Sequence, residues 1–419
     1  MSYFKPVSIS LSPNVEKDDV RLALNLVIRP WLWKRGKTIT ELEERFRQYL
    51  GVKHAVSFNS GRSALYAILR ALGEAEGNKV LMQAFTCNAA INPVLWAEMT
   101  PEYVDCDNNT FNIDIEDLRR KITPDTKILM VQHTFGQPAD MDEVMAIVQQ
   151  NNLTLIEDCA HALGAKYNRQ KVGTFGKASF FSFSRDKVIS SVYGGMAVTN
   201  DEQIGKKLLE IQKNLGVPKT YWVIQQILHP ILLNYIILPL YNFCDLGKIF
   251  LVLSQWVHIL SKAVHWKEKR GLKPDYFPKA LPNALAIMAL NQFNKLDMFY
   301  NHRKKLFKFY NENLRNTSFV LPVVEMCAEP SYLRYTVKHK NAQDIIYESW
   351  HKQNILLGDW YTTPIAPYDT KLEEMHYKMG MCPNAELCSK KTLNLPTHIN
   401  ISMEDAQRIV DFLKKHGKA

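Results

Sequence analysis

Two charged side chains near the middle of the chain have the types and the spacing to hold a reactive cofactor. Asp158 follows a short apolar run, residues 153–156, and Lys187 follows a second one, residues 178–183. Both runs have the length and composition of buried strands. In open α/β sheets, ligands collect at the carboxyl ends of the strands. Asp158 and Lys187 are therefore predicted to face one ligand site.

This pair is the minimum needed to hold pyridoxal 5′-phosphate (PLP). The amino group of Lys187 would form a Schiff base, and the carboxylate of Asp158 would keep the pyridinium nitrogen protonated, so that the ring acts as an electron sink. Alone, the pairing is weak evidence, because a lysine after a strand is usually a solvated surface residue and a strand-end aspartate is often a helix N-cap. The surrounding stretch favours the cofactor.

Three motifs surround the pair: EDCAHALGAKY, VGTFGKASFFSFSRDK and GGMAVTND. In this order and spacing they resemble the DegT-type sugar aminotransferases, a branch of the fold-type I PLP enzymes. The resemblance continues in QHTFGQPADM, FPKALPNALAIMALNQFNKLD and LLGDWYTTPIAP. It covers nearly the whole chain except residues 219–269.

The resemblance implies an α/β protein with the fold-type I PLP-transferase architecture. A large PLP-binding domain with a mostly parallel sheet is expected over 1–218, an apolar insertion over 219–272, and a linking helix with a smaller α+β C-terminal domain over 273–419. The residues support the parallel sheet independently, because short apolar strands alternate with helical stretches. These strands are expected at 55–58, 79–82, 101–104, 127–131, 153–156 and 178–183.

The resemblance also assigns roles at the ring of the cofactor. Lys187 is the Schiff-base residue and then the base that moves a proton between substrate and cofactor. Asp158 protonates the ring nitrogen. His161 stands where the family has Gln or His close to the phenolic oxygen.

A second group of residues is assigned to the cofactor phosphate. The turn before the helix predicted at 64–72 is a ready anion site, because free backbone N–H groups and the helix dipole converge there. It resembles the family's Ser-Gly-Thr-Ala loop, which assigns Gly61, Arg62 and Ser63 to the phosphate. Ser182 resembles the phosphate-binding serine five residues before the family's Schiff-base lysine.

Four positions depart from the family pattern. Cys87 replaces the usual aromatic residue that stacks on the cofactor ring, so a smaller thiol face is expected there. Tyr193 stands where the family usually has Glu. The family's neighbouring-subunit Asn, which reaches the phosphate, aligns near Pro278 and Lys279, and Lys279 is a candidate substitute. Further candidates for lining the substrate site are Trp360, Tyr361 and His398.

The cysteine count and the net charge indicate the cellular compartment and the kind of binding partner. Seven scattered cysteines in 419 residues favour a reduced, cytosolic protein, and none has metal-ligand spacing, so no metal site is expected. The first residues lack the pattern of a signal peptide. A formal charge of +10 suggests anionic partners, either phosphorylated small molecules or an acidic membrane face. No motif or basic-aromatic array supports nucleic-acid binding.

The apolar insertion leads to a second hypothesis, which is attachment to a membrane. Residues 221–244 contain no Asp, Glu, Lys or Arg, but Pro230 and Pro239 interrupt them. The next apolar run, 249–260, reaches roughly 18 Å as a helix, against a hydrocarbon core of about 30 Å. We therefore expect two broken helices within 221–261 lying in one leaflet of an anionic membrane, which makes the enzyme monotopic on the cytoplasmic face. The alternative is an apolar lid against a dimer partner.

The predicted reaction is amino transfer from an amino acid, with glutamate as the expected donor, to a nucleotide- or lipid-linked keto-sugar in cell-surface polysaccharide or glycan biosynthesis. The family's active site lies between two subunits, so the resemblance implies a homodimer. Two alternatives stay open. One is a PLP-dependent sugar dehydratase, whose relatives carry His at the place of Lys187. The other is a non-catalytic, membrane-associated sugar-binding protein.

Overall fold

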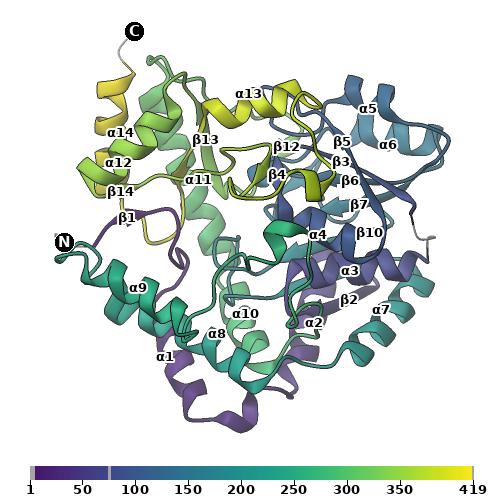
Figure 1. The fold of residues 1–419 in the computed structure, drawn as a ribbon, viewed down its shortest axis with the longest axis horizontal. Helices are drawn as coiled ribbons and strands as arrows, with labels where there is room; N and C mark the ends of the chain where they lie inside the picture. Colours follow the sequence, from purple (N-terminus) through teal and green to yellow (C-terminus); the bar gives the residue numbers. More distant parts are fainter. Residues whose placement is uncertain (1–4, 74–76, 418–419) are drawn as a thin grey trace.

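The computed structural model describes residues 5–73 and 77–417 and is built around a seven-stranded sheet (Figure 1). Its strand order is β2-β11-β10-β7-β6-β3-β5. Neighbours from β10 to β5 pair in parallel, whereas β11 pairs antiparallel with both β10 and β2. The expected mostly parallel sheet is thus confirmed. The strands are β2 (His54–Phe58), β3 (Lys79–Gln83), β5 (Thr100–Val104), β6 (Thr126–Gln132), β7 (Thr154–Asp158), β10 (Ala178–Ser182) and β11 (Gly195–Thr199).

Helices cover both faces of this sheet, which explains why its strands are apolar at nearly every position. In β6, Leu129 and Val131 belong to one hydrophobic core and Ile128 and Met130 to the other. The first core is closed by α1 (Lys17–Val27), α2 (Thr38–Leu50), α6 (Met141–Gln150) and α10 (Asn283–Phe293). The second is closed by α3 (Gly61–Leu72), α4 (Asn88–Trp96) and α7 (Glu202–Leu215).

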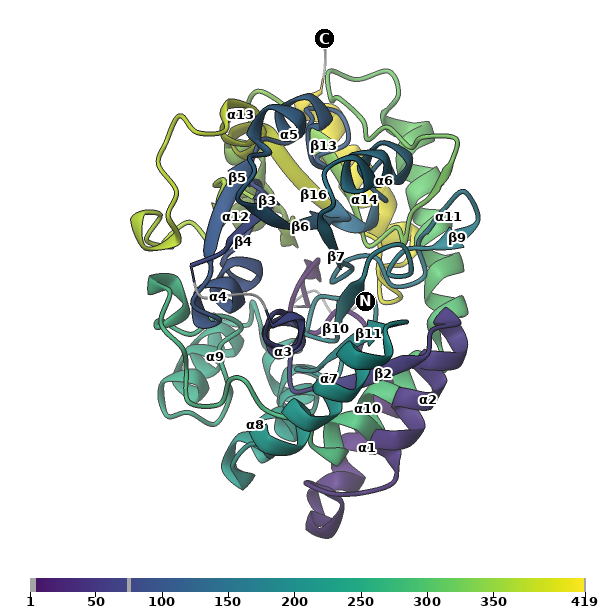
Figure 2. The ribbon, with the colours of Figure 1, turned by 90° about the vertical axis from the view of Figure 1, so that its right-hand side faces the viewer.

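The C-terminal part has its own core, centred on Tyr310, Tyr335 and Leu395. The antiparallel pair β13 (Arg334–Lys338) and β16 (Thr392–Pro396) is packed by α11 (Leu296–Leu314), α12 (Ala342–Gln353) and α14 (Met403–His416). A short strand, β15 (Ile365–Ala366), pairs with β4 (Thr86–Cys87) of the large domain. This pairing places residues 359–368 beside the carboxyl ends of the central strands. Strand β4 lies next to α4 (Figure 2).

The insertion folds as α8 (Thr220–Leu232), a π-helical turn η3 (Leu233–Ile237), α9 (Leu246–Trp256) and a short 3-10 turn η4 (Glu268–Arg270). Helix α8 packs along α1 and buries Trp222, Val223 and Ile227 in the main core. The apolar side of α8 is therefore covered by the protein itself, contrary to the expectation that both helices of the insertion lie in a bilayer. Within the described residues, no helix is both long and apolar enough to cross a membrane.

Candidate active site

One cavity of about 220 Å³ lies where the carboxyl ends of β7 and β10 meet the start of α3. It receives Asp158 from the end of β7, Ser182 from the end of β10 and Lys187 from the loop that follows. Most of the sequence-predicted residues line this cavity: Gly61, Arg62, Cys87, Asp158, His161, Ser182 and Lys187. Side chains up to 126 positions apart thus meet because parallel strands end at one edge of the sheet.

The position of Lys187 in the cavity wall is fixed by hydrogen bonds to the backbone. The Asn14 side-chain amide donates hydrogen bonds to the carbonyls of Lys187 (2.7 Å) and Val188 (3.2 Å). The Lys187 Nζ lies 4.7 Å from the centroid of the Trp360 ring. Removal from water disfavours the charged amine and lowers the pKa of Lys187 to about 8, and the nearby Arg334 acts in the same direction. At pH 7 roughly one-tenth of the amine is therefore in the neutral, nucleophilic form, far more than for a solvated lysine.

Asp158 lies deep in the same cavity. Its Oδ1 accepts a hydrogen bond from the Ala160 N–H at 2.9 Å, which fixes the carboxyl group at the strand end. Burial raises the pKa of Asp158, while the Ala160 N–H, Lys187 and His133 favour the carboxylate. A buried carboxylate near a lysine amine matches the acceptor required by a protonated heterocyclic nitrogen.

His161 forms part of an aromatic wall. Its ring stacks on Trp360, with centroids 5.2 Å apart and planes at 20°. Its Nδ1 accepts the Phe135 N–H at 3.2 Å, so the ring proton lies on Nε2. Burial, with Lys187 and Arg334 nearby, holds the pKa of His161 well below its usual range. His161 is therefore a neutral hydrogen-bond donor rather than a cation.

The start of α3 fits a phosphate group. An added Cβ at Gly61 would lie 3.0 Å from the Ser182 Cβ, so the missing side chain lets the Ser182 hydroxyl approach the helix N-terminus. Ser60 caps the helix by accepting the Ser63 N–H at 3.0 Å. Arg62 lines the cavity too, but its Nε forms an ion pair with Glu268 at 2.6 Å.

Three sequence-predicted residues lie elsewhere. Ser63 is fully buried behind the helix start and its hydroxyl donates to Asn59 Oδ1 at 2.7 Å. The Lys279 Nζ donates to the Leu215 carbonyl at 3.0 Å instead of reaching the cavity. His398 lines a separate hollow with residues 5–13, whereas Trp360 and Tyr361 do line the main cavity.

Sequence reasoning did not single out Arg185 and Asp186, which also line the cavity. Arg185 donates to the Ser261 carbonyl and hydroxyl at 2.7 Å, and its buried Nε has no hydrogen-bond partner among the described residues. The sequence signal that could have identified these two residues is their position directly before Lys187. Cys87 contributes a thiol whose pKa burial raises, so it presents an uncharged surface.

The groupings of potential metal ligands already have protein partners. His133, Glu157 and Cys159 lie together in the interior, where Glu157 accepts the backbone N–H groups of residues 173, 175 and 176. The second grouping is acidic and surrounds the Lys295 amine. Neither grouping borders the cavity that holds Lys187.

The geometry defines a fold-type I site for PLP, and comparison with known proteins agrees. The model of the DegT/DnrJ/EryC1/StrS aminotransferase family matches residues 14–228 and 274–414. The chain belongs to this family and is a PLP-dependent transaminase. The match omits residues 229–273, which contain η3, α9 and η4.

The similarity to relatives and to solved structures extends over nearly the whole chain. The chain is 27% identical to GDP-perosamine synthase of Caulobacter vibrioides, over 98% of each protein. It is 26% identical to the spore coat polysaccharide biosynthesis protein SpsC of Bacillus subtilis, over 99% of this chain and 97% of SpsC. Among solved structures, Helicobacter pylori PseC, an aminotransferase involved in the biosynthesis of pseudoaminic acid, superposes with a TM-score of 0.75 at 23% identity, covering 98% of this chain and 99% of PseC.

Proposed function

We propose that this enzyme transfers an amino group from an amino acid, with glutamate as the first candidate donor, to a keto-sugar for cell-surface polysaccharide or glycan synthesis. The observation that carries the proposal is the meeting of the Lys187 amine and the Asp158 carboxylate in one cavity. The aromatic side chains of Trp360, Tyr361 and Tyr368 on another wall suit the apolar face of a sugar ring. The names of the relatives point to the same substrate class.

The position of each cavity residue suggests a separate role in binding the cofactor or moving a proton. When bound, PLP supplies an electron sink for the carbon that loses a proton. Lys187, with a pKa of about 8, would hold the cofactor covalently and would take and return that proton. Asp158 would keep a proton at the ring nitrogen. The Nε2–H of His161 would be the donor for the phenolic oxygen, and the Cys87 thiol would give an uncharged surface beside the ring.

The phosphate is held at the start of α3. Gly61, the Arg62 backbone N–H and the Ser182 hydroxyl surround this position, and the helix dipole favours the anion. Arg185 adds a positive charge, and the partnerless Nε gives it a spare donor. Ser63 acts indirectly, since its N–H keeps Ser60 in the capping geometry.

Covalent trapping tests this assignment without any substrate. Borohydride reduction of the PLP-loaded protein, followed by peptide mass spectrometry, is expected to place the pyridoxyl group on Lys187. The Lys187→Ala variant should bind PLP only reversibly and show no modified peptide. Modification of another lysine to the same extent in that variant would overturn the role of Lys187.

Two alternatives are separated by a second experiment. A dehydratase of this fold carries His at the position of Lys187, and a binding protein transfers nothing. Incubation with ¹⁵N-glutamate and a panel of nucleotide-linked and polyprenyl-linked keto-sugars should yield a ¹⁵N-labelled amino-sugar. Loss of oxygen from the sugar without label would favour a dehydratase. Binding of a sugar without either change would favour a binding protein.

We further propose that the enzyme is a homodimer attached to the cytoplasmic face of a membrane through the insertion. The fully buried positions of α9 are Gly247 and Ser254, and its half-buried Phe250 and Leu251 pack on the small core around Ile237 and Tyr241. Other large apolar residues of the helix are exposed, with Trp256 at 75% and Val252 at 64% exposure. Such an outward apolar face favours the surface of a bilayer.

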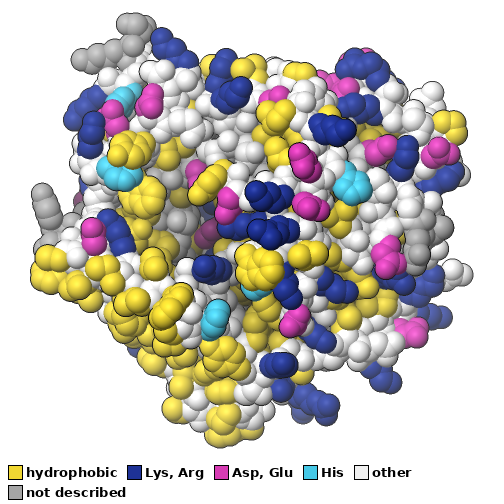
Figure 3. Space-filling model, in the orientation of Figure 1, with side chains coloured by type: hydrophobic (Ala, Val, Ile, Leu, Met, Phe, Trp, Pro, Cys, Tyr) yellow, Lys and Arg dark blue, Asp and Glu magenta, His cyan; other side chains and the backbone are white. Residues whose placement is uncertain are grey.

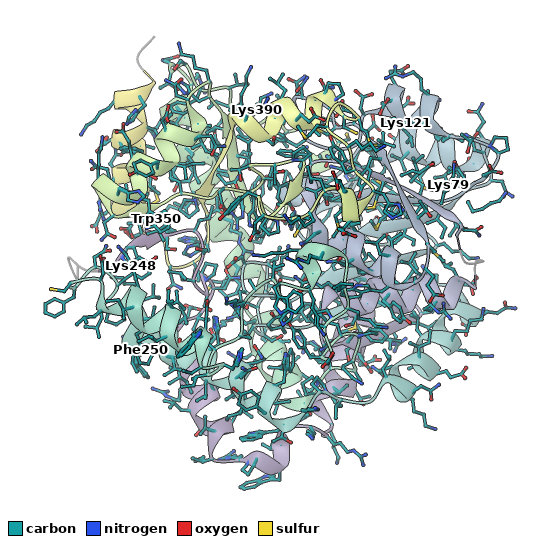
Figure 4. The ribbon with its side chains drawn as sticks, viewed as in Figure 1. Lys79, Lys121, Lys248, Phe250, Trp350 and Lys390 are labelled. Atoms are coloured by element: carbon teal, nitrogen blue, oxygen red, sulfur yellow. The ribbon has the colours of Figure 1, made fainter. Side chains whose placement is uncertain are left out.

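The surroundings of α9 suit an anionic bilayer. Figure 3 shows hydrophobic side chains gathered along the edge where α9 lies, and Figure 4 labels Lys248 and Phe250 on this helix. Exposed Lys262, Arg270 and Lys273 follow it in the chain. Each basic residue near anionic lipid adds about 1 kcal/mol of attraction. With a rise of about 1.5 Å per residue, the helix covers roughly half of the hydrocarbon thickness, so it would lie in one leaflet.

Flotation with vesicles tests the membrane surface. Wild type should float with vesicles of phosphatidylglycerol and phosphatidylcholine, and added salt should weaken the association. The double variant Val252→Asp, Trp256→Asp should stay in the dense fraction. Met326→Asp, at an exposed apolar residue outside the insertion, should float like wild type. If the α9 variant still floats, or if it converts a dimer into monomers, the face is not a membrane surface.

Light scattering tests the homodimer. The PLP-loaded protein is expected at twice the mass of one chain. A monomeric mass with labelled amino transfer intact would contradict the proposed dimer while leaving the reaction unaffected.

A further inference from the structure

The last part of the insertion crosses the mouth of the active-site cavity. Residues 261–268, called the strap below, run from the end of α9 to η4, and Ala263 and Val264 face the cavity. At its start, the Ser261 hydroxyl donates to Gln226 of α8 at 2.7 Å. At its end, the Glu268 carbonyl accepts the Asn92 side-chain amide of α4 at 3.0 Å. The strap therefore spans the cavity between α8 of the insertion and α4 beside the central sheet.

Three consecutive carbonyls of the strap are bound by side chains that line the cavity. Arg185 donates to Ser261 at 2.7 Å, the Tyr193 hydroxyl donates to Lys262 at 2.6 Å, and Arg62 donates to Ala263 at 3.3 Å. Such a series of donors from separate parts of the chain fixes the path of the strap backbone. Tyr193 is one of the positions that differ from the family pattern, and Arg62 stands where the family's Ser-Gly-Thr-Ala loop has Thr. Both side chains contact the strap.

The strongest attachment is the ion pair between Arg62 and Glu268. Glu268 has no exposed surface and the Arg62 side chain is 10% exposed, so neither charge is solvated by bulk water. Burial raises the pKa of Glu268 and Arg62 counteracts this, while the His265 N–H donates to its Oε2 at 2.8 Å. A buried charge that loses its partner is strongly unfavourable. Each residue therefore requires the other.

This pairing also bears on the cofactor. Arg62 would be a phosphate ligand only with its charge available, but the Glu268 carboxylate already neutralises it. A phosphate dianion on the same guanidinium would lie close to that carboxylate, and like charges repel. Arg185 has no carboxylate at hydrogen-bond distance among the described residues, and its Nε, like that of Arg62, has no hydrogen-bond partner there. The positive charge for the phosphate is thus better supplied by Arg185 than by Arg62.

We propose that Arg62 and Glu268 form a latch that holds the strap as a wall of the active site, and that the strap positions the sugar substrate through Ala263 and Val264. Arg62 is then a positioning residue rather than a cofactor ligand. This inference rests on the proposed function in one respect, that the cavity takes PLP. The exposed face of α9 and the cavity wall belong to one continuous segment, 246–268.

The test uses PLP-loaded wild type, Arg62→Ala, Glu268→Gln, Glu268→Ala and the double variant Arg62→Ala, Glu268→Ala. The control is Arg47→Ala, which breaks an exposed pair with Glu44. Three quantities are measured: the PLP dissociation constant, the rate of trypsin cleavage after Lys262, and the rate at which hydroxylamine abolishes the visible absorbance of the bound cofactor. Glu268→Gln keeps the shape of the side chain and removes only the charge.

If the latch exists, each single variant should accelerate cleavage and hydroxylamine attack by about tenfold, and the double variant should be no faster than the faster single variant, because the two residues act as one unit. The PLP dissociation constant should change by less than about threefold, since a latch residue does not contact the phosphate. Arg47→Ala should match wild type in all three. A circular-dichroism spectrum like that of wild type would show that folding is intact, although the variants that leave one charge unpaired should melt at a lower temperature.

Two outcomes would overturn the latch. A large loss of PLP affinity in Arg62→Ala, with unchanged or tighter binding in the Glu268 variants, would make Arg62 a phosphate ligand. Unchanged cleavage and hydroxylamine rates in every variant would mean that the strap is not held by this pair. Failure of wild type to bind PLP would instead refute the proposed function. The two failures are therefore distinguishable.

Discussion

At the scale of single residues, the active site depends on a lysine that is kept partly neutral. Lys187 is surrounded by protein on the side of Trp360 and Arg334, and Asp158 and Cys87 only partly compensate for the lost hydration. The pKa of Lys187 falls from the usual 10.5 of a lysine side chain to about 8. Burying this amine therefore lowers the free energy of unfolding, by an amount that depends on pH.

The sign of this dependence follows from linkage. Between pH 8 and 10.5 the unfolded chain binds more protons at Lys187 than the folded protein does, so stability rises with pH through this window. Below pH 8 the penalty is fully present, and its upper limit is roughly 3 kcal/mol. PLP-free Lys187→Met should therefore melt at a higher temperature than wild type at pH 7, and the difference should shrink toward pH 10.

Calorimetry of the two PLP-free proteins at both pH values measures this effect. Lys308→Met, at a lysine whose side chain is 78% exposed, serves as the control and should show no such pH-dependent difference. An equal gain for Lys187→Met at both pH values would point to lost hydrophobic packing rather than to titration.

At the scale of elements, the site depends on how closely β11 passes the start of α3. Gly195 begins β11 and pairs with Phe58 of β2 and Ser182 of β10. An added Cβ there would lie 2.5 Å from the Gly61 nitrogen and from backbone atoms of Ser60. Because these are main-chain atoms at the helix N-terminus, they have little room to move. Gly195 therefore sets the distance between the strand and the proposed phosphate position.

The substitution Gly195→Ala should destabilise the protein by about 3 kcal/mol and weaken PLP binding, because the overlap displaces the start of α3. Gly51→Ala is the matched comparison. Gly51 has a φ of +75°, and an added Cβ there would have nothing within 4 Å. Gly51→Ala should therefore lower the free energy of unfolding by about 1 kcal/mol through backbone strain and leave PLP affinity unchanged. Chemical denaturation and PLP titration measure both quantities. Similar effects of the two substitutions would contradict the role assigned to Gly195.

At the scale of the whole molecule, the loop that carries Lys187 is clamped by distant parts of the chain. Arg303 of α11 donates to the Val188 carbonyl at 2.8 Å and to the Asn14 Oδ1 at 2.9 Å. Asn14 in turn donates to the Lys187 carbonyl. Both Arg303 and Asn14 are buried at 1% exposure. The N-terminal segment and the helix leading into the C-terminal domain thus jointly fix the reactive lysine.

Replacing Arg303 with Met should therefore affect both folding and the site. The Val188 carbonyl would lose a buried charged donor, which is expected to cost about 2 to 3 kcal/mol. PLP affinity should fall as well, because the Lys187 loop loses one of its two anchors. The exposed Arg315→Met on the same stretch should do neither. Normal PLP affinity in a destabilised Arg303→Met would show that the clamp serves folding alone.

Most of the fold was predictable because its determinants are local. The strands at 79–83, 126–132 and 154–158 are continuous apolar runs bounded by polar residues, and such runs indicate buried parallel strands wherever they occur. The proposed catalytic pair followed from the same logic, since both residues come directly after a strand. By contrast, α8 and α9 are similarly apolar, and only packing against α1 decides that one is covered and the other exposed.

By itself, the sequence therefore determined the mostly parallel sheet, the edge at which ligands bind and the likeness of Lys187 and Asp158 to a PLP site. Only the tertiary structure decided the partners of the side chains in that site. It pairs Arg62 with Glu268, directs Ser63 to Asn59, and brings Tyr193 to the carbonyl of Lys262. Strand periodicity is set by neighbours along the chain, whereas the pairing of residues some 200 positions apart depends on how the insertion packs across the cavity.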